Sequence, residues 1–303
     1  MNTIGITGGT GFVGSHLTAL LLAKGYKVVI FTRNPGKKKT HTHIEYSYWE
    51  PAQNRCDHTA LKQLDAVVHL SGTPVSKRWT KQVKRDIVSS RVHDTKFLVT
   101  NLKREAPQCK TFIAASGIGF YGADAGKAPF TEGDAPANDF LGTTCVQWEQ
   151  ESLAAAEAMR TVIFRFGLVM GKESGAFPSF AKPLSFGVMP ILGTGHQVIS
   201  WIHIDDLVNL LFNSITNHEM NGIYNAVAPN PVSQKDLMKT IAQAKGGISI
   251  PVPVPQAALK LLLGEMSIEV LKSATVSASK LLDTGFKFQY PEIEPAVKAI
   301  LAS

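Results

Sequence analysis

Short apolar runs alternate with longer amphipathic stretches through the first half of the chain. Continuous apolar runs bounded by turn residues predict strands that are buried on both faces. They occur at residues 3–7, 27–31, 44–48, 66–70, 111–115 and 161–166. Helical periodicity lies between them, most clearly at 80–105 and 143–159. Strands that alternate with helices predict an α/β protein with a Rossmann-type, doubly wound parallel sheet.

The pattern changes after Gly171. Glycine, proline and aromatic residues over 175–195 predict a long loop or small lid. A strand is expected at 199–204, with Asp205 capping a helix that begins at Leu207, and another strand at 223–226 returns to the sheet. Further on, helices separated by the proline-rich segment 251–255 predict a smaller, mostly helical carboxyl-terminal region.

The turn between the first strand and the first helix contains Gly8, Gly11 and Gly14. In a dinucleotide-binding turn the first glycine permits the tight bend, the second lets the backbone approach a pyrophosphate, and the third allows close helix packing. The helix N-terminus then faces the phosphates. We therefore expect a dinucleotide crevice at this turn and at the carboxyl ends of the neighbouring strands, bordered by Gly8, Thr10, Gly11, Phe12, Val13, Gly14, Leu70, Ser71, Gly72, Ser116 and Gly117.

The second strand ends in Thr32 and Arg33, where an NAD-selective fold usually places an acidic residue against the ribose hydroxyls. No acid stands there. Arg33 is able to pair with a 2′-phosphate, and the lysines at 37–39 add positive charge nearby. The sequence thus favours NADP over NAD, with the lysine run also open to interpretation as a solvated loop.

Composition narrows the class of protein. The chain has 303 residues, 44% of them hydrophobic, and a net charge of +7 that is spread along its length. Without aromatic residues among the basic ones, this charge favours small anionic molecules over nucleic acid. Cys56, Cys109 and Cys145 have no metal-ligand or paired spacing, as is typical of a reducing compartment. With a strand starting near Met1 and no membrane-length apolar run, we expect a cytoplasmic protein without a membrane partner.

Seven segments carry a resemblance to a known family. They are 7–14, 90–91, 116–122, 148–149, 201–206, 225–232 and 285–290, which read TGGTGFVG, SR, SGIGFYG, WE, WIHIDD, NAVAPNPV and GFKFQY. In them the chain resembles the extended short-chain dehydrogenase/reductases, and more narrowly the atypical branch of epimerase family proteins, the YfcH-like relatives of sugar-nucleotide epimerases. The resemblance implies a Rossmann domain that binds a nicotinamide dinucleotide and a carboxyl-terminal substrate-binding region. We expect the NADP-binding domain at 1–170, completed by strands near 199–226, and an interleaved lid and substrate-binding region at 171–303.

The chemistry of that superfamily uses a serine or threonine to polarise the substrate, a tyrosine as acid/base, and a lysine four residues later that favours the tyrosinate. In this chain the three positions fall on Gly117, Cys145 and Glu149, and the superfamily's helix asparagine falls on Arg91. The usual catalytic set is therefore missing.

Cys145 and Glu149 share one helix face but do not replace the lost pair, because a carboxylate near a thiol raises its pKa. We interpret Cys145 as a small buried apolar residue and Glu149 as a surface or capping residue. Ser116, Tyr121 and His203 remain candidate acid/base groups. The alternatives are a packed Tyr121 whose hydroxyl lines the pocket and a structural His203.

Arg91 is expected to face the crevice and place a cation near the pyrophosphate or a substrate anion, with Asp86 on the same helix holding the ribose or orienting basic groups. A solvent-facing salt bridge is the alternative. By analogy with the fold, Val169 touches the nicotinamide side.

The sequence favours an NADP(H)-binding atypical reductase or epimerase-like enzyme acting on an unidentified small molecule. The competing hypothesis is a catalytically inactive regulator or scaffold that senses the dinucleotide. The substrate, the face of hydride transfer and the oligomeric state stay open.

Overall fold

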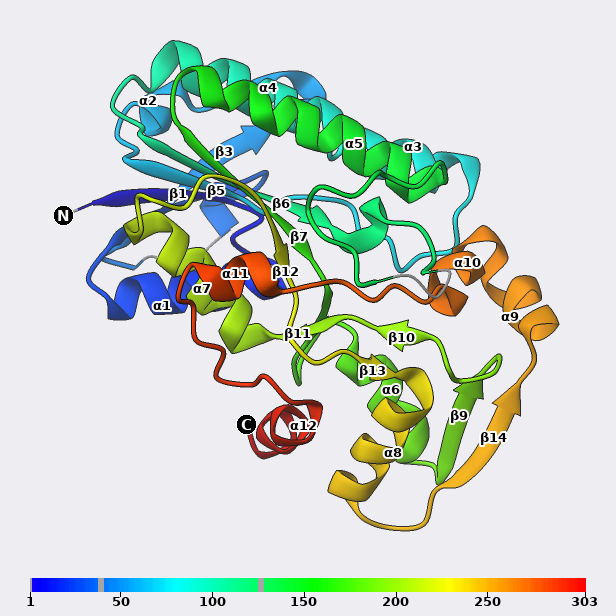
Figure 1. The fold of residues 1–303 in the computed structure, drawn as a ribbon. Helices are drawn as coiled ribbons and strands as arrows, with labels where there is room; N and C mark the ends of the chain where they lie inside the picture. The colour runs from blue at the N-terminus through cyan, green and yellow to red at the C-terminus, as the bar shows by residue number, and fades with distance from the viewer. Residues whose placement is uncertain (1, 38–40, 125–127) are drawn as a thin grey trace.

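The computed structural model describes residues 2–37, 41–124 and 128–303 and is built around one large β-sheet (Figure 1). Within these residues the main sheet has eight strands in the order β12-β7-β6-β5-β1-β2-β3-β4. Neighbouring strands run parallel, except that β4 is antiparallel to β3. The strands are β1 (Thr3–Thr7), β2 (Lys27–Thr32), β3 (Ile44–Glu50), β4 (Arg55–Cys56), β5 (Ala66–His69), β6 (Thr111–Gly117), β7 (Arg160–Phe166) and β12 (Gly222–Ala226).

Helices cover both faces of this sheet (Figure 1). Ile4 and Ile6 of β1 pack on the face covered by α1 (Phe12–Ala23) and α7 (Ile204–Thr216). On the opposite face, Val67 and its neighbours pack against α2 (His58–Leu61) and α4 (Val92–Glu105), and α5 (Phe140–Leu153) lies beside α4 against β6 and β7. Burial on both faces explains the unbroken apolar runs, and the doubly wound Rossmann fold predicted from them is confirmed.

The helix expected over 80–105 is two helices, α3 (Lys81–Ser89) and α4, which meet at Ser90 and Arg91. Both residues are held by the segment that follows β5. The Ser90 hydroxyl accepts the Thr73 N–H at 2.9 Å, and the Arg91 guanidinium donates to the Thr73 carbonyl at 2.9 Å. A tertiary contact thus interrupts a helical pattern that continues in the sequence.

The expected helix over 143–159 begins three residues earlier. Asp139 caps α5 by accepting the Gly142 N–H at 2.8 Å, and after Leu153 the chain continues as a 3₁₀ helix, η4 (Ala154–Glu157). The loop expected over 175–195 contains a helix and a strand, α6 (Phe177–Leu184) and β9 (Val188–Leu192). Pro178 stands in the first turn of α6, where a missing N–H costs no hydrogen bond.

The single strand expected over 199–204 is divided at Ser200. Its first part, β10 (Val198–Ile199), pairs with β13 (Val232–Ser233), and its second part, β11 (Trp201–His203), pairs with β8 (Leu168–Met170). The helix that follows also differs from the prediction. It begins at Ile204, and its cap is His203, whose Nδ1 accepts the Asp205 N–H at 3.2 Å. Asp205 lies in the first turn, where its negative charge interacts favourably with the positive end of the helix dipole.

The proline-rich segment expected between helices forms a strand, β14 (Ile250–Val254), which pairs parallel with β9. The Ile250 N–H donates to the Gly187 carbonyl, so the alternate residues Pro251 and Pro253 face the free edge, where no N–H is needed. The carboxyl-terminal helices are α8 (Gln234–Lys245), α9 (Gln256–Leu263), α10 (Ser267–Leu271), α11 (Ser279–Asp283) and α12 (Ile293–Ala302); further 3₁₀ turns are η1 (Pro35–Lys37), η2 (Pro51–Gln53), η3 (Ile118–Phe120) and η5 (Gly264–Met266).

The part of the chain beyond residue 170 contributes to both regions of the molecule. β12 joins the main sheet beside β7, whereas β9 and β14 form a separate two-stranded sheet. The division of the domains at residue 170 stays a prediction. In the described ranges, no helix is both long and apolar enough to span a membrane.

Candidate dinucleotide-binding site

The turn between β1 and α1 has the backbone geometry that its glycines predict. Gly8 has a φ of +70°, and a Cβ there would lie 2.8 Å from the backbone of Leu70 and Ser71. A Cβ on Gly14 would lie 2.3 Å from the Gly8 carbonyl oxygen. At Gly11 the nearest atom to a Cβ is that same oxygen, at 3.2 Å, and no other lies within 4 Å. Gly8 and Gly14 are thus required by packing, whereas Gly11 leaves open space above the turn.

The first turn of α1 presents backbone N–H groups at this open space. Gly11 is the N-cap of the helix, and it provides no side-chain hydrogen bond. In an α-helix the first N–H groups have no partner within the helix, here those of Phe12, Val13 and Gly14. Free N–H groups and the helix dipole together favour an anion at this position. Thr10 is exposed on the same turn.

The end of β2 lies beside the turn, because β2 pairs with β1 in register through Thr7 and Phe31. Thr32 closes the strand half-buried, and Arg33 follows with an exposed side chain. No acidic residue occurs between Phe31 and Lys37. The predicted contribution of Lys38 and Lys39, and of the Lys37 side chain, falls outside the described residues.

Across the crevice, the segment Leu70–Gly72 continues from the carboxyl end of β5. The Leu70 N–H donates to the Thr7 carbonyl at 3.1 Å, which holds this segment against β1. A Cβ on Gly72 would lie 3.5 Å from the Arg91 Cζ, so Arg91 faces the segment as predicted. Its guanidinium also lies over the Trp148 ring at 5.0 Å. The fixed cation therefore stands beside the crevice.

Two further residues predicted to contact the cofactor, Asp86 and Val169, lie in different surroundings. Asp86 is exposed on α3 and accepts a hydrogen bond from Gln82 at 2.6 Å. Val169 lies in the middle of β8, in register with Ile202, and packs with Phe12 against the core. The structure thus brings Arg91 to the crevice and leaves Asp86 on the surface.

A fully buried histidine ties together the strand ends that border the crevice. His69 Nδ1 lies 2.6 Å from the Thr7 hydroxyl and its Nε2 lies 2.9 Å from the Thr95 hydroxyl. Burial lowers the pKa of His69 to about 4, so the imidazole is neutral. No sequence pattern selects this residue, because a histidine at the end of an apolar strand has no local signature.

We expect His69 to make stability depend on pH. The folded pKa lies below the ordinary value of 6.5, so an unfolded chain takes up a proton between pH 6.5 and pH 4 that the folded protein does not. Stability is therefore fully present above pH 6.5 and falls by about 2–3 kcal/mol on acidification to pH 4.5. Urea unfolding of the parent and of His69→Gln at both pH values isolates this contribution, and equal losses in the two proteins would contradict it.

Three of the residues selected from the sequence belong to one buried polar cluster near the carboxyl ends of β6 and β7. The Ser116 hydroxyl donates to Glu149 Oε1 at 2.6 Å. Arg165 of β7 forms two hydrogen bonds to the same carboxylate, both at 2.8 Å, and a third at 2.8 Å to the Tyr121 hydroxyl. The side chains of Arg165 and Glu149 are 2% and 5% exposed. We call Ser116, Tyr121, Glu149 and Arg165 the buried cluster.

The Tyr121 side chain is packed, as one interpretation of the sequence expects, and its hydroxyl is enclosed in this cluster. Tyr121 is fully buried, and its hydroxyl is 2.8 Å from the Asn225 side-chain oxygen and 2.9 Å from the Thr131 carbonyl. Burial raises the pKa of Tyr121, although Arg165 acts in the opposite direction. An acid/base role for Ser116 or Tyr121 stays a prediction, and both hydroxyls are already engaged.

Glu149 is not the surface or capping residue that the sequence suggested. It is buried because it pairs with Arg165, a residue that lies 16 positions away on β7. Cys145 is a buried thiol, as expected, and burial together with the Glu149 charge raises its pKa to about 12. Such a thiol does not ionise near neutral pH.

Arg165 is the main residue that sequence reasoning missed. The signal was a single arginine inside the apolar run Thr161–Phe166, which is written TVIFRF in the sequence. A charge in a strand buried on both faces requires a partner. His203, the third acid/base candidate, is buried at the start of α7 and borders a different cavity.

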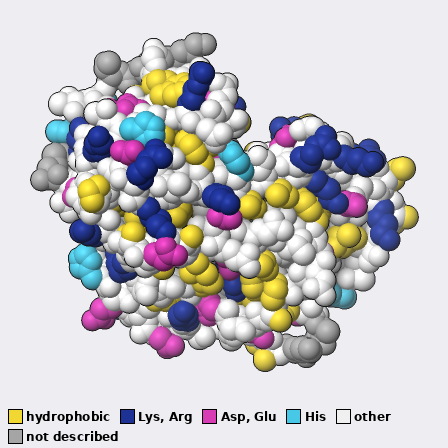
Figure 2. Space-filling view, turned by 90° about the horizontal axis from the view of Figure 1, so that it is seen from above, with side chains coloured by type: hydrophobic (Ala, Val, Ile, Leu, Met, Phe, Trp, Pro, Cys, Tyr) yellow, Lys and Arg dark blue, Asp and Glu magenta, His cyan; other side chains and the backbone are white. Residues whose placement is uncertain are grey.

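The charge on the surface is less even than along the sequence. Lys77, Arg78, Lys81 and Arg85 are exposed around the start of α3, the first helix after β5. Viewed from above, Lys and Arg side chains gather on the lobe that carries α3 and α9 (Figure 2). Among the described residues, no group of three or more His, Cys, Asp or Glu side chains is arranged to hold a metal ion.

Two families match the chain along most of its length. Residues 4–226 match a family described as "NAD dependent epimerase/dehydratase family", and residues 254–300 match one described as "Domain of unknown function (DUF1731)". The first match includes the glycine turn, the buried cluster and β12. The second covers the carboxyl-terminal helices from α9 to α12.

Similar proteins extend over the same length. The epimerase family protein YfhF of Bacillus subtilis (strain 168) is 36% identical over 301 residues, which cover 99% of this chain and 98% of that protein. The crystal structure of human epimerase family protein SDR39U1 (isoform 2) with NADPH has a TM-score of 0.85 and 27% identity, and 99% of each chain is covered.

A more distant structure shares the fold alone. The UDP-glucuronic acid 4-epimerase of Bacillus cereus, solved in complex with UDP-glucuronic acid and NAD, has a TM-score of 0.81 at 20% identity, covering 99% of this chain and 98% of that chain. Together with the Rossmann sheet and the glycine turn, these matches show that the chain belongs to the NAD dependent epimerase/dehydratase family, among the atypical short-chain dehydrogenase/reductases named epimerase family proteins.

Proposed function

We propose that the protein binds NADP(H) and is a reductase or an epimerase-like enzyme for a small molecule. The observation that carries the proposal is the turn at Gly8–Gly14, which aims the N-terminus of α1 at open space beside Arg33. The human SDR39U1 structure, which contains NADPH, supports the choice of cofactor. We further propose a cytoplasmic protein with no nucleic-acid or membrane partner.

The residues at the crevice fit the cofactor in three places. The free N–H groups of Phe12 and Val13 suit the pyrophosphate, and Gly11 leaves room for it. Arg33 suits the 2′-phosphate because a guanidinium forms paired hydrogen bonds to phosphate oxygens. Arg91 suits a further anionic group, of the cofactor or of the substrate, near Gly72. When bound, NADPH supplies a hydride to the reaction.

We expect Arg33→Ala to remove the preference for NADPH. Loss of one charge-assisted contact to phosphate costs roughly 1.5–3 kcal/mol, or about 10- to 100-fold in affinity, while NADH binding should not change. Calorimetry with both dinucleotides measures this directly. Arg55→Ala is a matched control, since Arg55 is an exposed arginine on β4. Equal affinities in the parent, or an unchanged preference in Arg33→Ala, would refute the assignment.

The proposed chemistry does not use a tyrosine–lysine pair. Gly117, Cys145 and Glu149 stand at the expected catalytic positions, and none of them polarises, protonates and biases a substrate as serine, tyrosine and lysine do. Either the substrate carries its own acidic group, or a protein group at the crevice supplies the proton. The exposed cations around α3 favour an anionic substrate.

A catalytically inactive NADPH sensor is the second candidate. It is favoured by the enclosure of Ser116 and Tyr121 in the buried cluster, which leaves neither hydroxyl free for a substrate. NADPH oxidation in the presence of quinones, aldehydes and sugar nucleotides separates the two functions. Turnover of any of these supports an enzyme, whereas tight NADPH binding without turnover across the panel supports the sensor.

A further inference from the structure

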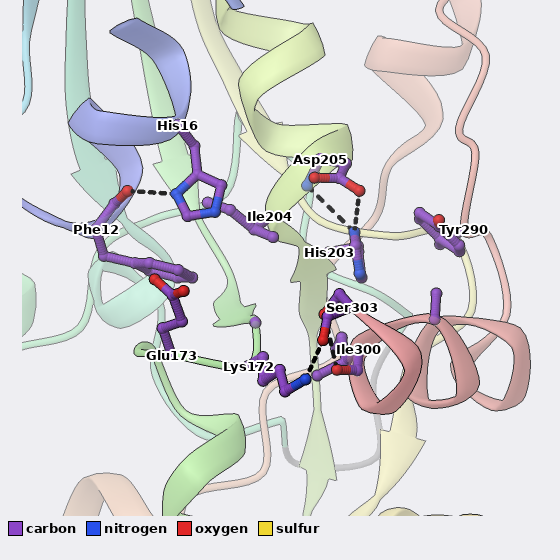
Figure 3. A pocket seen from close by; sticks show the side chains of 12 residues that line it. Phe12, His16, Lys172, Glu173, His203, Ile204, Asp205, Tyr290, Ile300 and Ser303 are labelled. Atoms are coloured by element: carbon purple, nitrogen blue, oxygen red, sulfur yellow. Dashed lines mark hydrogen bonds and ion pairs between the residues drawn. The ribbon is translucent and has the colours of Figure 1, made fainter. Parts of the chain in front are cut away.

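A second cavity lies outside the dinucleotide crevice, between the starts of α1 and α7 and the end of α12 (Figure 3). Its volume is about 380 Å³, within the range that holds a small molecule. Among the residues that line it are Phe12, His16, Glu173, His203, Asp205 and Tyr290. The backbone of Phe12 belongs to the glycine turn while its ring borders this cavity, so the two sites are neighbours but distinct.

His203 provides a buried hydrogen-bond donor without an acceptor. Its Nδ1 accepts the Asp205 N–H at 3.2 Å and lies 3.6 Å from the Asp205 carboxylate, and we assign the proton of the neutral ring to Nε2 on the shorter contact. The side chain is 4% exposed, and its Nε2 is one of the buried polar atoms of the described residues that has no hydrogen-bond partner. In Figure 3 the ring extends from Asp205 towards Ser303, across the cavity. A buried polar atom of this kind calls for a ligand that accepts a hydrogen bond.

The rest of the wall favours positive charge in that ligand. Glu173 and Asp205 bring carboxylates to the cavity, and Figure 3 shows Glu173 next to the Phe12 ring. Lys172 is the one Lys or Arg among the described lining residues, and it donates to the Ser303 carbonyl, so two carboxylates stand against one ammonium group in the wall. The Tyr290 ring lies 4.0 Å from the His203 ring, centroid to centroid. Aromatic faces and carboxylates together attract an ammonium group.

We propose that this cavity binds a small organic cation that also carries a hydroxyl or carbonyl oxygen, such as an amino sugar or amino alcohol. The oxygen accepts the hydrogen bond of His203 Nε2, and the ammonium group lies between the carboxylates and the aromatic rings. His16 adds a second polar contact. Its Nδ1 donates to the Phe12 carbonyl at 3.0 Å, so Nε2 is the ring nitrogen left for the ligand. The site does not depend on the identity of the dinucleotide.

Three hexoses of similar shape and different charge test the proposal. Glucosamine is a cation, glucose is neutral and glucuronate is an anion, and each is titrated into the full-length protein labelled with ¹⁵N at histidine. The His203 Nε2–H signal should shift saturably with glucosamine, with an affinity at least about tenfold higher than for glucose. Glucuronate should cause no saturable shift.

Two substitutions at His203 separate its two roles. His203→Asn keeps an acceptor at the position of Nδ1 and removes the Nε2 donor, so the helix cap is retained and the affinity for glucosamine should fall about tenfold. His203→Gln keeps a donor near Nε2 and loses the cap, so the melting temperature should fall while the affinity stays within about threefold. Binding to both variants is followed by calorimetry.

A matched pair of glutamate substitutions tests what the carboxylates contribute to glucosamine binding. Glu173→Gln should lower the affinity for glucosamine by about threefold and leave the affinity for glucose unchanged. Glu294→Gln should change neither, because Glu294 pairs with Lys298 on α12 and does not line the cavity. The proposal is overturned by equal binding of the three hexoses, by preference for glucuronate, by no saturable shift with glucosamine, or by parental affinity in His203→Asn.

Discussion

Gly11→Val is expected to abolish NADPH binding and leave the protein folded. Gly11 has an extended backbone conformation, with φ −84° and ψ 179°, which any residue adopts. A Cβ there would come within 3.2 Å of the Gly8 carbonyl oxygen alone, so the turn needs to shift by only a few tenths of an ångström to accept a side chain. The two further methyl groups of valine would fill the space above the helix N-terminus, where the pyrophosphate is expected.

Loss of two charge-assisted hydrogen bonds to the pyrophosphate corresponds to about 3 kcal/mol or more, or at least about a hundredfold in affinity. Calorimetry with NADPH gives the affinity, and thermal unfolding without cofactor checks the fold. A Gly11→Val protein that is folded and still stabilised by NADPH would place the cofactor elsewhere.

Gly14→Ala is the matched control, with the opposite outcome. Its Cβ would lie 2.3 Å from the Gly8 carbonyl oxygen and 2.7 Å from the Gly9 Cα, which are both backbone atoms. Backbone does not yield as a flexible side chain does, so the substitution should lower stability itself, by about 1–3 kcal/mol or more. Gly11 and Gly14 therefore separate a glycine required by the ligand from one required by packing.

The strands of the main sheet show which elements a sequence pattern predicts. The strand Thr3–Thr7 was predicted to the residue, and Thr111–Gly117 to within two residues, because both are buried on both faces and read as unbroken apolar runs. Burial in a parallel sheet leaves its signature in every residue of the strand. The glycine turn is equally predictable, since Gly8 and Gly14 meet local backbone requirements and the spacing of the three glycines is typical of a dinucleotide-binding turn.

Elements that depend on contacts between residues far apart in the sequence were not predicted. The interruption at Ser90 and Arg91 depends on Thr73, which lies 17 residues from Ser90, and the helical periodicity continues through it. The sequence did not predict β14, because prolines usually exclude a strand. Here the prolines are tolerated because they lie at a free edge. His203 takes the place of the expected Asp205 as the cap because its ring accepts the Asp205 N–H two residues further on, so the helix begins at Ile204.

The residues of the candidate site also fall into those that local patterns predict and those that depend on packing between distant elements. Residues on the turn and at the strand ends were predicted from fold rules, and the structure places Gly8, Leu70, Gly72 and Arg91 around one crevice. The partners of Glu149 depended on how α5 packs on β7, which no spacing within α5 reveals. A single arginine in an apolar strand was the one available signal.

The second large effect concerns that ion pair, since Arg165→Met should destabilise the protein by about 3–5 kcal/mol. The substitution leaves the Glu149 carboxylate buried with one remaining hydrogen bond in the cluster, from Ser116, and removes the cation that faces the Tyr121 hydroxyl. An uncompensated buried charge is far more costly than the loss of the attraction itself. Urea unfolding at neutral pH measures the change.

Lys298→Met is the control, because Lys298 also pairs with a glutamate but lies exposed on α12. No measurable change is expected there, since solvent screens an exposed pair. A destabilisation by Arg165→Met of less than about 1 kcal/mol would mean that water or another group reaches the Glu149 carboxylate and compensates it.

The double variant Glu149→Leu/Arg165→Met shows what the pair contributes beyond its own compensation. Replacing both charges with apolar side chains removes the desolvation cost together with the attraction, so the double variant should recover most of the stability that Arg165→Met loses. Ser116 and Tyr121 would then keep their positions on β6 and η3 without the carboxylate and guanidinium that engage their hydroxyls. NADPH oxidation gained by a folded double variant would show that the buried cluster suppresses catalysis, and the sensor would then be the better account of the parent protein.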